Sequence, residues 1–162
     1  MQTFSVVTRA RCAFVDITDL VARAIRQSTV KDGIAVVFVP HTTAGVTINE
    51  NADPSVREDM INHLERAVPQ GADYGHSEGN SPAHIKASMM GSSATVIVSD
   101  GRPVLGTWQG IYLWEHRQQA HQRHQDKNPN FRLQCHRDFL RTGAPRARPA
   151  RTALVITPHE RQ

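Results

Sequence analysis

The sequence predicts an α+β domain with a mixed, largely antiparallel sheet and two main helices. Segments with strand character outnumber segments with helical character. The two strongest helical patterns stand between groups of strands, and the later strands follow one another across short turns. Strands gathered into groups, with helices inserted between the groups, favour the α+β class.

The first part of the chain predicts a strand, a short paired segment and a helix. Residues 3–8 alternate weakly between apolar and polar side chains, and a turn through 9–12 leads to a paired segment at 13–16. Thr18 is a suitable N-cap for the helix that follows, and a turn at 31–33 ends it. The apolar stripe of this helix consists of Leu20, Val21, Ala24 and Ile25.

The next two strands place polar side chains at a sheet edge. Residues 34–39 are continuously apolar and branched, which is typical of a strand buried on both faces. Pro40 cannot donate a further ladder hydrogen bond, so we expect His41 to leave the sheet there. Residues 46–49 alternate apolar and polar, which predicts a second, half-buried strand.

The second helix has a well-marked start. Asp53 is a good N-cap, and Pro54 suits the first helical position. The apolar residues that recur at helical spacing are Val56, Met60, Ile61, Leu64 and Val68. We therefore expect Asn49 and Glu50 to leave the preceding strand beside this helix start.

A long loop separates the second helix from the last strands. Residues 69–83 are rich in Gly, Pro, Ser, Asn and Asp, and loops of this length are often functional. Residues 83–90 predict a short helix or turn. Three short strands follow, at 95–99, 104–107 and 110–114, and Asp100-Gly101 predicts a hairpin between the first two.

We expect three regions along the chain. Residues 1–117 form the α+β domain, and residues 118–150 are a polar, basic insert or divergent tail with poor order, because apolar residues become scarce there. Residues 151–162 contain a last strand at 153–157 and the C-terminus.

The net charge of +4 is unevenly distributed. Residues 1–116 hold 9 Lys and Arg against 12 Asp and Glu, a net −3, whereas residues 117–162 hold 10 against 3, a net +7. No RNA-reading aromatic motif or zinc-finger spacing accompanies the basic part, so a solvated extension is favoured over a nucleic-acid partner.

Composition also bears on localisation. Nowhere do 18 apolar residues run together, and the N-terminus lacks a charged-then-apolar order, so we expect neither a membrane partner nor a signal peptide. Cys12 and Cys135 lie far apart without metal-ligand spacing. We interpret both as thiols of a cytoplasmic protein.

Histidines mark the candidate site. His41, His76 and His84 lie in irregular polar segments or next to them, and a fold of the long loop over the strand end would bring them together. Three imidazoles with carboxylates suit a divalent metal, Zn or Mg. Individual histidines that form hydrogen bonds or transfer protons, or plain surface histidines, are the alternatives. His63 is expected to be exposed and structural.

Neutral polar residues around these histidines suit a phosphate or diphosphate. The candidates for substrate binding are Thr42, Asn49, Asn80, Gln109 and Lys86, and those for catalysis are His41, Glu50, His84 and Glu115. Gln109 either orients a ligand or binds backbone, and Lys86 either supplies a cation or faces solvent. A turn with a cap is the simpler reading of Asn49, Glu50 and Asp53.

Three segments resemble, in order and spacing, the signatures of the YjbQ family of small bacterial and archaeal proteins. They are HTTAGVTINENADPSVREDM, YGHSEGNSPAHIKASMMG and GTWQGIYLWEHR. The resemblance covers about residues 1–117 and implies a compact α+β domain, a homotrimer and a polar pocket. The family's motif positions are His41, Asn49, Glu50, Asp53, His76, Asn80, His84, Gln109 and Glu115.

The resemblance implies a secondary thiamine-phosphate synthase activity, in which a pyrimidine diphosphate joins a thiazole phosphate and expels pyrophosphate. A metal or cationic clamp on the leaving group would be needed. The alternative is a non-catalytic trimeric protein that binds a small phosphorylated metabolite. After Arg117 the chain departs from the family pattern, through either a genuine extension or a changed reading frame.

Overall fold

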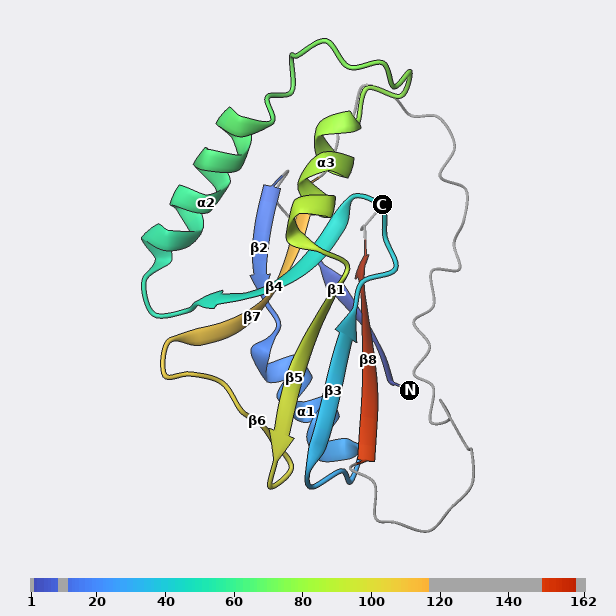
Figure 1. The fold of residues 1–162 in the computed structure, drawn as a ribbon, viewed down its shortest axis with the longest axis vertical. Coiled ribbons are helices and arrows are strands. Elements are labelled where there is room, and N and C mark those ends of the chain that lie inside the picture. The colour runs from blue at the N-terminus through green and yellow to red at the C-terminus, as the bar shows by residue number, and fades with distance from the viewer. Residues whose placement is uncertain (1, 9–11, 117–149, 160–162) are drawn as a thin grey trace.

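The computed structural model describes residues 2–8, 12–116 and 150–159, which form two β-sheets and three helices (Figure 1). The first sheet has the spatial order β1 (Gln2–Val7), β8 (Ala150–His159), β3 (Gly33–Phe38), β5 (Ser93–Ser99), β6 (Arg102–Pro103). The second has the order β2 (Cys12–Asp16), β7 (Gln109–His116), β4 (Ala44–Glu50). The helices are α1 (Thr18–Gln27), α2 (Pro54–Ala67) and α3 (Ser81–Met90). None of them, within the described residues, is both long and apolar enough to cross a membrane.

The strand directions confirm the expected fold class. β8 runs parallel to its neighbours β1 and β3, whereas β5 runs antiparallel to both of its neighbours, β3 and β6. The second sheet is antiparallel throughout. The sheets are therefore mixed and largely antiparallel. α3, the segment expected to form a short helix or turn, is a helix of 10 residues, as long as α1, whereas α2 has 14. The insert expected at 118–150 lies outside the described residues, except for its last position.

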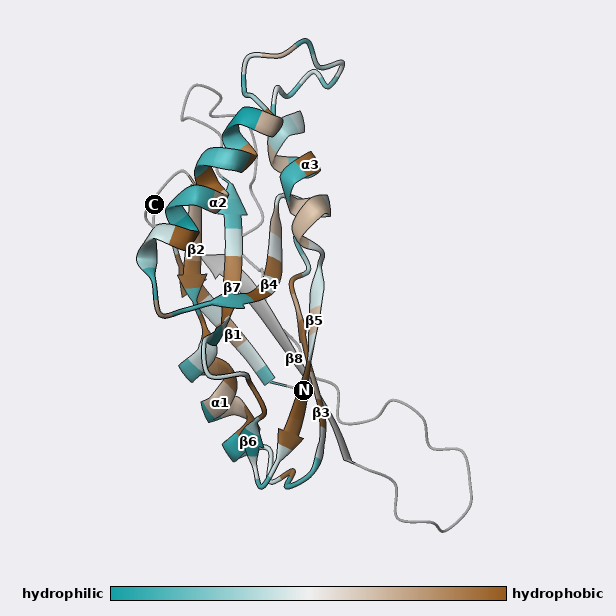
Figure 2. Ribbon diagram, turned by 60° about the vertical axis from the view of Figure 1, so that its left-hand side comes forward, coloured by the Kyte–Doolittle hydropathy of each residue, from teal (hydrophilic) through white to brown (hydrophobic). Residues whose placement is uncertain are grey.

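The main core lies between the first sheet, α1 and one face of the second sheet. Ala35 and Val37 of β3, Val21 of α1 and Leu113 of β7 are all fully buried in it. The other face of the second sheet packs under α2, where Trp114 belongs to a smaller aromatic cluster. α2 and α3 lie toward one end of the molecule and α1 toward the other (Figure 2).

One turn and one position in β4 depend on glycine or on a left-handed backbone. Asp100 and Gly101 have φ values of 49° and 69°, which closes the β5–β6 hairpin that this dipeptide predicts. Gly45 lies where β4 passes the end of α3, and a Cβ added there would stand 2.7 Å from the carbonyl oxygen of Gly91. Only glycine permits this close approach.

Three local predictions are wrong. Thr18 is the first residue of α1 rather than its N-cap, because its Oγ1 accepts the Ile111 N–H at 2.9 Å from β7 instead. No strand forms at the expected 104–107. The strand that pairs with β5 is Arg102–Pro103, and the Gln109 N–H bonds the Gly106 carbonyl in a turn after it. The 34–39 segment is buried on one face only, and Phe38 on the other is 39% exposed.

Candidate functional site

The residues that the sequence indicates fall into two groups at opposite ends of β4. In the register of β4 with β7, Ala44 lies opposite Glu115 and Glu50 lies opposite Gln109. The six steps from Ala44 to Glu50 span about 20 Å. The first end carries His41, Thr42, His84 and Glu115, and the second carries Asn49, Glu50 and Gln109.

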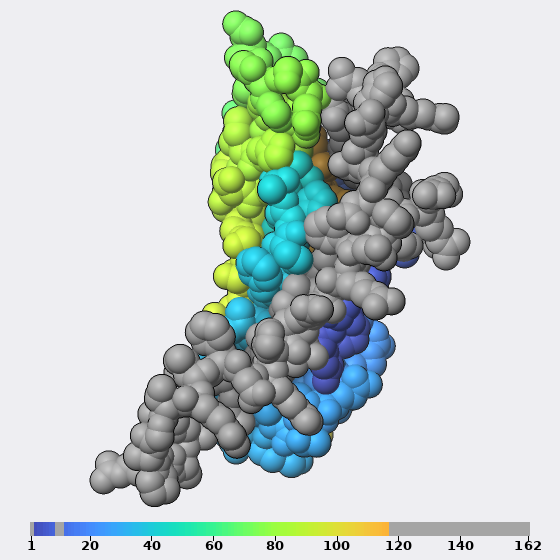
Figure 3. All heavy atoms as spheres, turned by 90° about the vertical axis from the view of Figure 1, so that its right-hand side faces the viewer, coloured from blue at the N-terminus to red at the C-terminus, as the bar shows by residue number. Residues whose placement is uncertain are grey.

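We call His41, His76 and His84 the histidine corner. His84 on α3 reaches the segment after β3, since its Nδ1 lies 3.1 Å from the Thr42 carbonyl oxygen. The His76 ring, from the long loop, stands edge-to-face with the His84 ring at 5.6 Å between centroids. On the face shown in Figure 3, the segment after β3 (cyan) lies beside α3 (yellow-green).

The hydrogen bonds of the histidine corner set its proton positions. A carbonyl oxygen can only accept, so Nδ1 of His84 carries the proton and Nε2 keeps a lone pair. The Thr43 N–H donates to Nδ1 of His41 at 3.1 Å, which places the proton of neutral His41 on Nε2. His84 also lines a shallow, open hollow on α3, together with Ile85, Ser88 and Met89. A donor and an acceptor of protons are thus presented near an open surface.

Three other predicted site residues near this end have different surroundings. Asn80 is the residue before α3, and its Nδ2 donates to Glu78 at 3.1 Å. Lys86 is completely buried, and its Nζ donates to Glu65 at 2.6 Å. Glu115 is 4% exposed and, because side chains alternate along a strand, lies on the opposite face of β7 from its neighbour His116.

At the far end of β4 the amides bond the protein itself. The Asn49 Nδ2 donates to the Met60 sulfur at 2.7 Å, and its Oδ1 accepts the Glu50 N–H at 2.8 Å. Gln109 accepts the Gly106 N–H at 2.8 Å through Oε1, so its amide holds the turn before β7. Of the two roles left open for Gln109, the structure shows the backbone contact.

Asp53 caps α2 as the sequence predicts. Its Oδ1 accepts the Ser55 N–H at 2.8 Å, and this hydrogen bond holds the pKa of the Asp53 carboxyl below its usual range. The exposed carboxylate thus satisfies a backbone donor that the first helical turn leaves without a partner.

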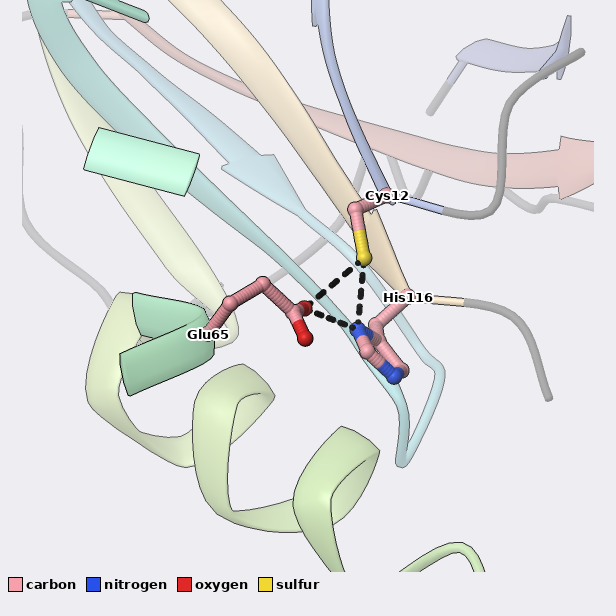
Figure 4. A group of neighbouring side chains, drawn as sticks. All are labelled: Cys12, Glu65 and His116. Carbon is pink, nitrogen blue, oxygen red and sulfur yellow. Dashed lines mark hydrogen bonds and ion pairs between the residues drawn. The ribbon is translucent and has the colours of Figure 1, made fainter. Parts of the chain in front are cut away.

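A partly buried polar cluster that the sequence did not indicate lies between β2, α2 and β7 (Figure 4). The Cys12 Sγ lies 2.9 Å from His116 Nδ1 and 3.1 Å from Glu65 Oε1, and the last two atoms are 3.5 Å apart. Among the described residues, this is the one group of three metal-ligand side chains whose ligand atoms all lie within 4.8 Å of one another. The histidine corner does not meet that distance.

Neighbouring residues stabilise the ionised form of Glu65. Burial alone would raise the pKa of Glu65, but hydrogen bonds from Lys86 and Cys12 and the positive charge of Lys86 outweigh burial and lower that pKa. No spacing in the sequence indicates this arrangement, since Cys12 is 53 residues from Glu65 and 104 from His116. The β2–β7 register pairs Cys12 with His116, and α2, which packs over this sheet, brings Glu65 to them.

Comparison with known proteins places the chain in a family. A sequence model described as UPF0047 protein YjbQ-like matches residues 2–126. The chain belongs to the YjbQ-like family. A YjbQ-like UPF0047 protein of Methanocaldococcus jannaschii is 56% identical over 112 residues, which cover 69% of this chain and 81% of the relative. YugU of Bacillus subtilis is 44% identical over 116 residues, covering 71% and 88%.

Solved structures of YjbQ-like proteins have the same fold. That of an uncharacterised conserved protein from Clostridium acetobutylicum gives a TM-score of 0.71 at 53% identity and covers 73% of this chain and 92% of its own. A protein of unknown function from Sulfolobus solfataricus gives 0.66 at 32% identity, with 70% and 83% covered. The family and fold expected from the three motifs are confirmed, and the function of this family is uncharacterised.

Proposed function

We propose that this YjbQ-like protein binds a small phosphorylated metabolite at the histidine corner and acts on it as a thiamine-phosphate-synthase-like transferase. The carrying observation is the pair of rings His76 and His84, 5.6 Å apart beside an open hollow. Because an N–H···O bond spans about 2.7–3.2 Å, two imidazoles at this spacing can both reach one phosphate group, with His84 donating from Nε2 once that nitrogen is protonated. The resemblance supplies the reaction class, and the rings supply a place for its anionic leaving group.

The corner offers groups for proton transfer as well as for binding. The Nε2 lone pair of His84 can take a proton at the edge of the hollow, while Nε2–H of His41 can donate one. Thr42 is exposed next to both and offers its hydroxyl. A protonated imidazole beside the leaving pyrophosphate would stabilise the negative charge that develops there.

A divalent cation would add the charge that the corner lacks, and three imidazoles suit Zn better than Mg, which prefers oxygen ligands. The imidazoles of His41, His76 and His84 would be its ligands, but they would first have to close, since their ligand atoms are not all within 4.8 Å. Lys86 cannot substitute for the metal, because its ammonium is buried against Glu65. In this proposal Lys86 pairs with Glu65 inside the protein and does not touch substrate.

Assembly as a homotrimer would bring in the residues at the far end of β4. About 20 Å of strand separates Glu50 from the histidine corner of the same chain. Catalytic roles for Glu50 and substrate contacts by Asn49 therefore require a second subunit. An exposed apolar area on the first sheet supports self-association, since Phe38, Ile97 and Val104 are 39%, 62% and 51% exposed.

Binding without catalysis is the second candidate function. This function is favoured because two of the predicted substrate-binding groups already have partners within the protein. Lys86 forms an ion pair with Glu65, and the Gln109 amide accepts a hydrogen bond from its own turn. A trimer with exposed imidazoles and few cations would hold a phosphorylated metabolite without expelling pyrophosphate efficiently.

The two functions are separated by measuring binding and turnover in the same variants. Pyrophosphate binding is followed by calorimetry, and thiamine phosphate formation from the two phosphorylated precursors by chromatography. His84→Ala is expected to lower turnover by about 100-fold, as for loss of a proton-transferring group. His63→Ala, an exposed histidine on α2, is the matched control and should leave both readouts unchanged.

The results for these variants distinguish binding from catalysis and also test whether the histidine corner is the site. Weaker pyrophosphate binding in His84→Ala, with the same background turnover in every protein, establishes the binding function and removes the synthase. Unchanged pyrophosphate binding in both His84→Ala and His41→Ala would refute the histidine corner as the site. Ile97→Lys is expected to shift the mass measured by light scattering from trimer to monomer.

A further inference from the structure

We infer that Cys12, Glu65 and His116 form a binding site for a divalent transition metal of the zinc class, separate from the histidine corner. One thiol, one imidazole and one carboxylate converge there from β2, β7 and α2 (Figure 4). A mixed sulfur, nitrogen and oxygen set suits Zn²⁺, whereas Mg²⁺ and Ca²⁺ prefer oxygen ligands.

The separations of the three ligand atoms are close to those of a metal site. The Cys12 Sγ to His116 Nδ1, Sγ to Glu65 Oε1 and Nδ1 to Oε1 distances are 2.9, 3.1 and 3.5 Å. Tetrahedral zinc, with bonds of 2.3 Å to sulfur and 2.0–2.2 Å to nitrogen and oxygen, places such atoms roughly 3.3–3.6 Å apart. The Nδ1–Oε1 separation already fits, and the two separations from Sγ would lengthen by roughly 0.4–0.7 Å to admit the ion.

The tautomer of His116 favours a cation in the centre. The Nε2 of His116 faces the side-chain oxygen of Gln70 at 3.4 Å, and that oxygen can only accept, so the proton of the neutral ring belongs on Nε2. Nδ1 then presents a lone pair to Cys12. The Cys12 thiol then has one proton, which it can donate to Nδ1 or to Glu65 Oε1. One metal ion, in contrast, would bind Sγ, Nδ1 and Oε1 at the same time.

The residues behind these three groups resemble the outer shell of a metal site. Metal-ligating histidines usually donate their second ring nitrogen to an oxygen, as His116 does toward Gln70. Lys86 donates to Glu65 Oε1 at 2.6 Å and takes one of its lone pairs. The second lone pair, which now accepts from the Cys12 thiol, remains for the ion.

The charges and burial of the site are compatible with zinc. A thiolate and a carboxylate balance the two charges of Zn²⁺, and Lys86 adds one positive charge behind Glu65. His116 is 2% exposed, but Cys12 and Glu65 are half-buried, so solvent reaches one side. Three protein ligands leave a fourth position for water or a ligand atom.

This site and the histidine corner use different sides of α3. His84 and Lys86 are two positions apart in the helix, and residues at that spacing do not face each other. The two sites share no ligand residue, so each can be tested with variants of its own residues.

The test uses the full chain, stripped with a chelator and titrated with Co²⁺ and then Zn²⁺. Co²⁺ bound to a thiolate gives a near-ultraviolet charge-transfer absorption, which Zn²⁺ abolishes by displacement. We expect about one equivalent of this signal in the wild type and its loss in Cys12→Ser and in His116→Gln. Cys135→Ser, which removes the only other cysteine, and His84→Ala should both retain it.

A second readout does not depend on colour. Zn²⁺ is expected to slow alkylation of Cys12 at least tenfold, measured on the Cys12 peptide by mass spectrometry, and Glu65→Gln should abolish the protection while circular dichroism verifies folding. Retention of the cobalt–thiolate signal in Cys12→Ser, or alkylation of Cys12 at the same rate with and without Zn²⁺, would overturn the site.

Discussion

Removing the two charges of the Lys86–Glu65 pair one at a time is expected to have unequal effects on stability. The Nζ of Lys86 donates to Glu65 Oε1 at 2.6 Å, and the two side chains differ in exposure. Lys86 is 0% exposed, whereas Glu65 is 34% exposed. Water can therefore replace a lost partner of Glu65 but not of Lys86.

The magnitudes follow from this difference. Glu65→Gln leaves a fully buried ammonium without a counter-charge, which costs about 3–5 kcal/mol in unfolding free energy. Lys86→Met leaves a carboxylate that solvent partly hydrates and that still accepts from Cys12, so the cost is nearer the 1–3 kcal/mol of one unsatisfied hydrogen-bonding group. The double variant removes both charges and should cost less than the sum by about 2 kcal/mol.

Urea unfolding followed by circular dichroism, at pH 7 and with a chelator present, measures all four proteins. The chelator keeps a bound metal from contributing to the stability differences. Equal losses for the two single variants, or a double variant whose loss is the plain sum, would show that the pair does not behave as a buried ammonium held by a half-exposed carboxylate.

Three further predictions concern acid stability, close packing and capping. Because folding lowers the pKa of Glu65, the ionised carboxylate contributes to the free energy of unfolding fully above the unfolded pKa of about 4.3, and this contribution is lost as the pH falls through the folded pKa. The wild type should therefore lose stability below pH ~4.3 more steeply than Glu65→Gln. Parallel curves of urea midpoint against pH for the two proteins would contradict this. Gly45→Ala should cost about 1–3 kcal/mol, because the new Cβ would stand 2.7 Å from the Gly91 carbonyl oxygen; a melting temperature equal to the wild type would refute the close approach. Asp53→Ala should cost about 1 kcal/mol through loss of the Ser55 hydrogen bond, whereas Asp53→Asn should cost clearly less; equal urea midpoints for the two variants would argue against capping.

Local signals in the sequence were enough for most helices and strands. Asp53 and Pro54 identify the start of α2, and Asp100-Gly101 identifies the β5–β6 hairpin, because caps and turns depend on neighbouring residues. Thr18 shows the limit of such signals. Its hydroxyl serves a backbone N–H of β7, 93 residues away, and this tertiary contact overrides the local capping preference.

The same limit explains what the sequence indicated about the candidate site. The motif residues His41 and His84 do lie near one end of β4, since α3 packs there and His84 bonds Thr42. Glu50 and Gln109 belong to the same motifs but lie at the far end of β4. A motif that runs along an extended strand has its first and last residues far apart, and the order of residues in the sequence does not show this.

The cluster of Cys12, Glu65 and His116 was beyond prediction from spacing. Its members come from three elements, and their approach depends on the pairing of β2 with β7 and on how α2 packs over that sheet. Shifting the β2–β7 register by one residue would turn Cys12 to the other face and remove it from the cluster.

The place of β8 has a consequence for how this protein forms during synthesis. The strand follows residue 149, yet it stands between β1 and β3 and pairs with both. Until the ribosome has delivered it, β1 lacks its neighbour within the first sheet and one side of β3 presents unpaired backbone groups. Such edges invite pairing with other chains, so the nascent polypeptide should depend on chaperone protection until its last strand arrives.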